Sequence, residues 1–82
     1  MEDDFLFKAF PESIHYRIYV EKEREKFGER SIVTLVATGL TEKGVARYEE
    51  RHVFGEEKEA VEKARSLKKK WREIGTPGEW MV

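Results

Sequence analysis

Two histidines, His15 and His52, are the only side chains in this sequence of a type that normally exchanges a proton near neutral pH. Cysteine is absent, which excludes a cysteine nucleophile and a cysteine-ligated zinc site. The sequence contains no His-Glu-x-x-His spacing, no glycine-rich phosphate loop and no Gly-x-Ser-x-Gly motif. These observations predict a protein without enzymatic activity, metal or cofactor. A zinc or catalytic site formed by the two histidines and a glutamate is the alternative.

Arginine, threonine and tyrosine side chains form a different candidate site, one that would bind a partner without reacting. Strand alternation places three arginines, two threonines and one tyrosine on one face of a predicted sheet. Arginine and threonine donate to phosphate oxygens and tyrosine can stack on a base, so this face suits nucleic acid. The alternative is ordinary ion pairing with Glu21 and Glu49. The six residues are Arg17, Tyr19, Thr34, Thr38, Arg47 and Arg51.

A second candidate surface is a row of basic residues on a predicted helix. Four of them lie within about 60° of one another on a helical wheel, and Lys68 flanks them. Such a row suits contact with phosphate groups. The alternative is a solvated helix face, in which Glu62 and Glu73 pair with parts of the row. The four residues are Lys58, Arg65, Lys69 and Arg72.

The charge of the chain is distributed unevenly, although its net value is only −1. Residues 1–57 carry 9 basic and 13 acidic side chains, whereas residues 58–82 carry 7 basic and 4 acidic ones. A positive C-terminal third attracts anionic partners even when the whole protein is nearly neutral. Asparagine and glutamine, the usual readers of adenine, are absent, so the sequence favours binding to backbone or shape over sequence-specific recognition.

The composition is typical of a protein from an organism that lives at high temperature. Charged residues make up 40% of the chain, and the heat-labile residues Asn, Gln and Cys are all missing. A chain of 82 residues is expected to form one domain with a thin core. No apolar run is long enough to span a membrane, and the acidic N-terminus does not resemble a signal peptide. The sequence therefore predicts a cytoplasmic protein without a membrane partner.

Apolar residues expected at the surface suggest an alternative function, that of a protein-interaction or homodimerisation module. Another protein or a second copy of the chain would cover them, which would add stability to a thin core. A pI of about 6.1 favours this alternative, because dedicated nucleic-acid binders are usually basic overall. The residues predicted for this interface are Phe5, Phe7, Ile32, Val36 and Trp80.

Alternating apolar and polar residues predict three strands. Residues 14–21 alternate cleanly, and residues 45–54 place Ala46, Tyr48, His52 and Phe54 on one face. Residues 31–38 are apolar on both faces, which is typical of a central strand. The charged stretch 22–30 suits a long hairpin connection, and residues 39–44, with a glycine at each end, suit a shorter one.

A helical period follows the strands, with acidic residues in its first turn and basic residues near its end. The predicted fold is α+β in the order β-β-β-α: a three-stranded antiparallel meander in residues 14–54 and one long amphipathic helix in residues 56–74, packed on one face. Residues 75–82 form a tail. Residues 1–13 form a short N-terminal element whose spacing fits either a helical turn or a strand. If the helix covers the more apolar face of the sheet, the face with the arginines stays open.

In layout, three strands followed by a helix resemble the DNA-binding domains of integrase N-termini and of AP2-type factors, which read DNA with the sheet face. The spacing of Phe54, Ala60 and Ala64 carries this resemblance. The layout also resembles the last four elements of a double-stranded RNA-binding domain. That module opens its last helix with lysines, whereas Glu56 and Glu57 stand there in this chain and would repel phosphate. The resemblance implies nucleic-acid binding as an expectation and assigns the chain to no family.

Overall fold

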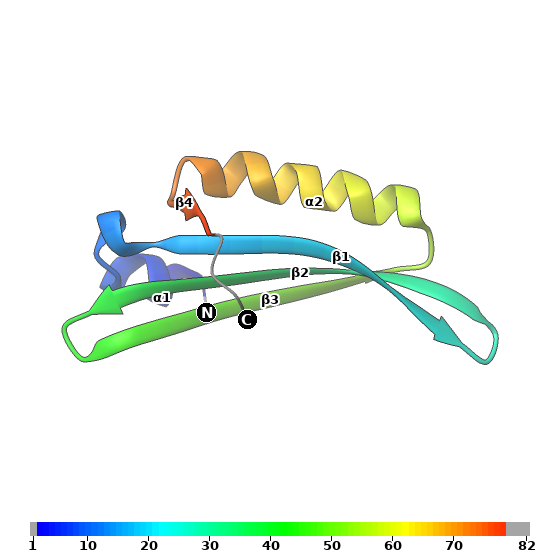
Figure 1. The fold of residues 1–82 in the computed structure, drawn as a ribbon, viewed down its shortest axis with the longest axis horizontal. Helices are drawn as coiled ribbons and strands as arrows, with labels where there is room; N and C mark the ends of the chain where they lie inside the picture. Colours follow the sequence, from blue (N-terminus) through cyan, green and yellow to red (C-terminus); the bar gives the residue numbers. More distant parts are fainter. Residues whose placement is uncertain (1, 79–82) are drawn as a thin grey trace.

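In a computed structural model, the protein consists of a mixed four-stranded sheet and two helices (Figure 1). The structure describes residues 2–78. The sheet order is β3-β2-β1-β4, in which β1, β2 and β3 are antiparallel and β4 is parallel to β1. The predicted α+β class with a C-terminal helix is confirmed. The prediction of a purely antiparallel three-stranded sheet is wrong, because short β4 adds a parallel strand. The elements are α1 (Glu2–Lys8), a 3-10 turn (Pro11–Ser13), β1 (His15–Glu25), β2 (Gly28–Thr41), β3 (Gly44–Phe54), α2 (Glu57–Arg72) and β4 (Thr76–Pro77).

Strand β2 lies between β1 and β3, as its apolar residues on both faces predict. Tyr16 and Tyr48 flank Ala37 across the sheet, so these three residues share one face. Helix α2 covers that face and leaves the other one open. The helix buries the residues that recur at helical spacing, which are Ala60, Ala64, Leu67 and Trp71.

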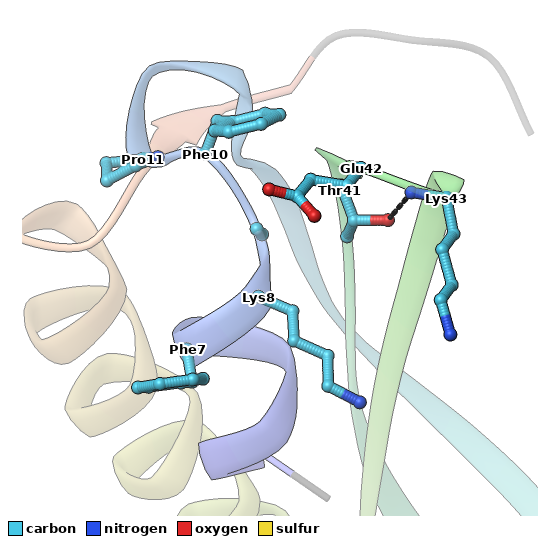
Figure 2. Close-up of a pocket in the computed structure, with 8 residues that line it drawn as sticks. Phe7, Lys8, Phe10, Pro11, Thr41, Glu42 and Lys43 are labelled. Atoms are coloured by element: carbon cyan, nitrogen blue, oxygen red, sulfur yellow. Dashed lines mark hydrogen bonds between the residues drawn. The ribbon is translucent and has the colours of Figure 1, made fainter.

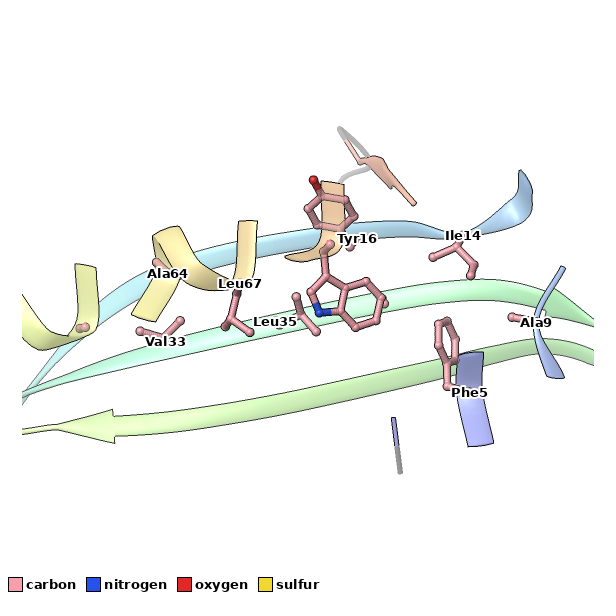
Figure 3. Close-up of a cluster of buried hydrophobic side chains, with 11 residues drawn as sticks. Phe5, Ala9, Ile14, Tyr16, Val33, Leu35, Ala64 and Leu67 are labelled. Carbon is pink, nitrogen blue, oxygen red and sulfur yellow. The ribbon is translucent and has the colours of Figure 1, made fainter. Parts of the chain in front are cut away.

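The core lies between α2, α1 and the covered face of the sheet (Figure 3). Its centre is Trp71, whose side chain is fully buried. The Trp71 ring stacks on Tyr48 with 5.9 Å between ring centroids, and it lies 6.1 Å from Tyr16 and 6.4 Å from Phe5. Because α1, α2, β1 and β3 each contribute one of these rings, aromatic contacts join the helices to the sheet.

The long hairpin connection predicted for residues 22–30 is wrong. Strands β1 and β2 continue through this stretch to a two-residue turn, and the hairpin extends beyond the N-terminal end of α2 (Figure 1). Its charges alternate in sign and meet across the two strands: Arg24 Nη2 lies 3.4 Å from Glu29 Oε1, and Arg30 Nη2 lies 3.3 Å from Glu23 Oε1. Cross-strand pairs of this kind allow a charged sequence to form a strand without apolar burial.

The N-terminal segment that the sequence left open begins with helix α1. Phe5 and Ala9 are both buried because residues four apart lie on the same side of a helix. Phe7, which a strand would have placed with them, points to solvent and is 90% exposed. After the helix, the Phe10 N–H donates to the Leu40 carbonyl at 2.9 Å, which ties the segment to β2.

Strand β4 lies within the predicted tail, residues 75–82. The Thr76 N–H donates to the Ile14 carbonyl at 3.0 Å, and the Gly78 N–H donates to the Tyr16 carbonyl at 2.7 Å. These are main-chain bonds, which require no particular side-chain pattern, so alternation could not reveal the strand. Within residues 2–78, no helix is long and apolar enough to cross a membrane.

Candidate functional site

The open face of the sheet carries the six residues predicted to contact nucleic acid. The register places Tyr19, Thr34 and Arg51 in one row across the three long strands, and it places Thr38 opposite Arg47 in another. The sixth residue, Arg17 of β1, lies in the row between them. The structure therefore brings the predicted set together on the face that α2 does not cover.

Carboxylates pair with arginines of this open face. Arg47 Nη2 lies 3.0 Å from Glu49 Oε2, and Arg51 Nη2 lies 3.8 Å from Glu23 Oε2. Both pairs are solvent-exposed, so each contributes at most about 1 kcal/mol to stability. Each of these carboxylates also reduces the positive potential that a phosphate group would meet at the open face.

Two residues predicted for a protein interface, Ile32 and Val36, also lie on the open face. They are only 3% and 6% exposed, although no helix covers them. They belong to central strand β2, where the side chains of both neighbouring strands flank each residue. Consequently they offer little apolar surface to a partner.

The basic row on α2 is in a different environment from the arginines of the open face. Of the described residues, none forms an ion pair with any side chain of this row, and the predicted pairing with Glu62 and Glu73 is absent among them. By contrast, Lys70 on another side of the helix donates to Glu2 at 2.6 Å. The row, called the basic ridge from here on, consists of Lys58, Arg65, Lys68, Lys69 and Arg72.

A hollow of about 420 Å³ lies where the basic ridge meets strand β1. Lys68 and Arg72 of the ridge line it together with Arg17 of the sheet. Two surfaces that the sequence treated as separate candidates therefore converge at this point. The remaining lining residues are Tyr16, Ile18, Pro77 and Gly78.

A second hollow, of about 490 Å³, lies between the end of α1 and the β2–β3 turn (Figure 2). Phe7, Lys8 and Phe10 line one side of it, and Thr41 and Lys43 belong to the turn on the other side. The Lys43 N–H donates to Thr41 Oγ1 at 3.2 Å, which fixes the turn. Phe7 and Phe10 are the aromatic residues that line this hollow, and aromatic residues are enriched in protein interfaces.

The other residues predicted for a protein interface have separate positions. Phe5 is buried in the core, where its ring lies 6.0 Å from Tyr48. Phe7 is exposed beside the second hollow. Trp80 lies outside the described residues. Of the predicted interface set, the described structure thus leaves Phe7 as the large apolar side chain open to a partner.

The two histidines do not form a common site. His15 is on the open face, opposite Thr38, whereas His52 is on the covered face, opposite Val33. His52 Nε2 lies 2.7 Å from Glu50 Oε2 in a partly buried pair. Within residues 2–78, no group of three histidine or acidic side chains is arranged to hold a metal ion.

We expect Tyr48 to make stability fall at alkaline pH. Burial and, next, the Glu50 carboxylate raise the pKa of the Tyr48 hydroxyl from 10.0 to about 12. The folded state therefore holds this proton more tightly than the unfolded chain does. Its stabilising contribution is complete below about pH 10 and is lost as the pH rises through 12. Urea unfolding across this range should show a steeper loss in the wild type than in Tyr48→Phe.

Lys22 and Lys70 also have raised pKa values, caused mainly by hydrogen bonds to Glu57 and Glu2. Both lysines therefore also make stability fall as the pH rises, and both are still present in Tyr48→Phe. Tyr19→Phe, a change on the open face, is the control and should keep the wild-type slope. Equal slopes for Tyr48→Phe and the wild type would contradict the assignment.

Comparison with known proteins assigns no relatives: no family model, curated protein or solved structure matches this chain. The candidate sites are therefore assigned from the chemistry and the positions of their own residues. The sequence did not reveal the hollow at β1, because it depends on how α2 crosses the strand. It did contain a signal for the Glu50–His52 pair, since residues two apart on a strand share a face.

Proposed function

We propose that this protein is a non-catalytic module that binds the phosphate backbone of nucleic acid through the basic ridge of α2. The observation that supports it most is the absence of a carboxylate partner, within residues 2–78, for any cation of the ridge. Lysines and arginines without such partners attract a polyanion and release its counterions. The open face is the secondary candidate, because Arg47 and Arg51 already have carboxylates beside them.

Helix stability alone does not account for the ridge. The helix dipole favours cations in the last turn, which explains Lys69 and Arg72 but not Lys58 or Arg65. Helix α2 carries seven basic and only three acidic side chains, and like charges four residues apart, such as Arg65 and Lys69, destabilise a helix slightly. Binding of an anion would account for such a row of basic residues.

Nucleic-acid binding by the ridge predicts a strong dependence on salt. Five phosphate contacts correspond to a log-log slope of about −4 to −5 on duplex and about −3 to −4 on single strands, with affinity of roughly micromolar or weaker. The double change Arg65→Ala and Lys69→Ala should reduce the steepness by about 1.5 and weaken binding at low salt. Titration of duplex DNA, single-stranded DNA and RNA at several salt concentrations measures both quantities.

The matched control is the double change Arg47→Ala and Arg51→Ala, which removes two arginines from the open face. It should leave the slope unchanged. If this control flattens the slope and the ridge variant does not, the site belongs on the open face. If none of the three nucleic acids binds at low salt, the proposed function is wrong.

Failure of nucleic-acid binding would favour the second candidate, a protein-interaction or homodimerisation module. Its support is the exposed aromatic pair beside the second hollow, Phe7 and Phe10, which are 90% and 43% exposed. Sedimentation of the wild type and Phe7→Ala would then show whether a self-associated species depends on this end of the molecule.

A further inference from the structure

The turn of the β1–β2 hairpin presents an aromatic ring to solvent at one end of the molecule. Phe27 is 94% exposed and lies in the turn that joins β1 to β2, where Glu25 pairs with Gly28. Figure 1 shows this turn at one end of the molecule. The ring contacts Lys26, whose Nζ lies 5.7 Å from the ring centroid. The molecule extends 46 Å along its longest axis, so the tip is far from the core at Trp71.

Folding does not require a phenylalanine at this position. The β2–β3 turn has the same construction, with two turn residues followed by a glycine at positive φ: Gly28 at 144° and Gly44 at 119°. At the position equivalent to Phe27, that turn carries Lys43, which is exposed. A polar residue therefore satisfies the same turn, whereas an exposed aromatic ring adds no burial to the fold.

The charges of the hairpin differ between its two faces. Lys22 and Arg24 lie on the face of β1 that α2 covers further along, and Lys26 follows them in the turn. The odd-numbered glutamates of β1 lie on the open face, where Glu23 and Glu25 pair with Arg30. Lys22 and Arg24 have exposed carboxylate partners, Glu57 and Glu29. Because these carboxylates reduce the positive potential at Lys22 and Arg24, the cation of this face that stays open to a phosphate group among the described residues is Lys26 in the turn.

These observations connect the tip with the basic ridge. The ridge occupies α2, and the basic residues of β1 continue from the start of α2, where Lys22 Nζ lies 2.9 Å from Glu57 Oε2, toward the tip. At the tip, Lys26 has no carboxylate partner among the described residues and lies beside an exposed ring. A cation beside an aromatic plane is the arrangement that binds a phosphate and stacks on its base in proteins that hold single strands.

We propose that Phe27 stacks on an unpaired nucleobase, so that the ligand of this protein is a single-stranded segment of DNA or RNA. The inference rests on the proposed function, since the ridge supplies the backbone contacts that bring a strand to the tip. Inside a duplex each base is stacked between its neighbours and offers Phe27 no free face. The tip therefore discriminates between single strands and duplex.

The test compares three labelled probes of equal length, oligothymidylate, oligouridylate and a blunt DNA duplex, by fluorescence anisotropy at low salt. Phe27→Ala should weaken binding of a single strand about 5- to 100-fold and leave the salt slope and duplex affinity unchanged. Phe27→Tyr should keep the wild-type affinity. The DNA and RNA probes distinguish the two sources of an unpaired base.

Phe7→Ala is the matched control, because Phe7 is a phenylalanine of similar exposure that belongs to α1, away from the tip. This variant should bind all three probes with the wild-type affinity. If Phe27→Ala binds single strands as the wild type does, while the ridge variant still flattens the salt slope, the stacking inference fails and the proposed function stands. Equal losses on duplex and single strands would also overturn stacking. A wild type that binds none of the probes would overturn both.

Discussion

Replacing Trp71 with alanine should lower the free energy of unfolding by about 3 to 5 kcal/mol. Trp71 is fully buried, and its ring contacts aromatic residues from α1, β1 and β3. A domain of this length has a total stability of about 4 to 12 kcal/mol. The variant should therefore unfold at a much lower urea concentration and melt well below the wild type. Urea and thermal unfolding, followed by circular dichroism, measure both changes.

Trp71→Phe is the informative companion change, because it keeps an aromatic ring at the centre of the core. The indole Nε1 of Trp71 is buried and has no hydrogen-bond partner among the described residues. Since an unsatisfied buried donor costs about 1 to 3 kcal/mol, removing it offsets part of the lost volume. Trp71→Phe should thus cost clearly less than Trp71→Ala. Equal losses would show that the ring contacts described for Trp71 do not hold the core together.

Replacing Gly75 with alanine should destabilise the protein by about 1 to 3 kcal/mol through overpacking. A Cβ atom at this position would lie 2.7 Å from the Ile14 carbonyl oxygen and 2.7 Å from Ile14 Cγ2. The carbonyl belongs to the backbone and accepts the Thr76 N–H, so it cannot move without weakening β4. Urea unfolding measures the loss, and slower hydrogen exchange at Thr76 in the wild type than in the variant would locate it.

Gly55→Ala is the matched control for this change. A Cβ atom at Gly55 would meet nothing within 4 Å, and its backbone is outside the positive-φ region. The control should leave stability unchanged or raise it slightly, by reducing the freedom of the unfolded chain. A loss as large at Gly55 as at Gly75 would attribute the effect to the backbone and contradict the close approach to Ile14.

The sequence predicted those parts of the fold that depend on side-chain period. Alternation placed Tyr16 and Tyr48 on one face and Arg47 on the other, and the two-sided apolarity of residues 31–38 identified the central strand. It failed where pairing depends on charge or on the main chain alone. The charged residues 22–30 form strands through cross-strand ion pairs, which a search for apolar alternation does not detect.

The candidate site was predictable to a similar extent. A helical wheel brings Arg65 and Lys69 together, and alternation brings Arg47 and Arg51 together, without any structure. Which of these cations has a carboxylate partner depends on rotamers and on neighbouring strands, as the contact between Arg51 and Glu23 shows. Phe27 could not be predicted as a binding residue, because a long loop would hold its aromatic ring in no defined position. In the structure the strands continue to a two-residue turn, which defines the position of the ring.

The position of Phe5 has a consequence for how the chain folds during its synthesis on the ribosome. Phe5 packs against Tyr48 and Trp71, so it reaches the later of these two contacts only after 66 further residues have been synthesised. At about 5 to 20 residues per second, that delay is about 3 to 13 s. During this time the apolar segment around Phe5 is open to nascent neighbours and chaperones. The acidic residues Asp3 and Asp4 directly before it are the kind of flanking charge that keeps such a segment from aggregating before α2 is synthesised.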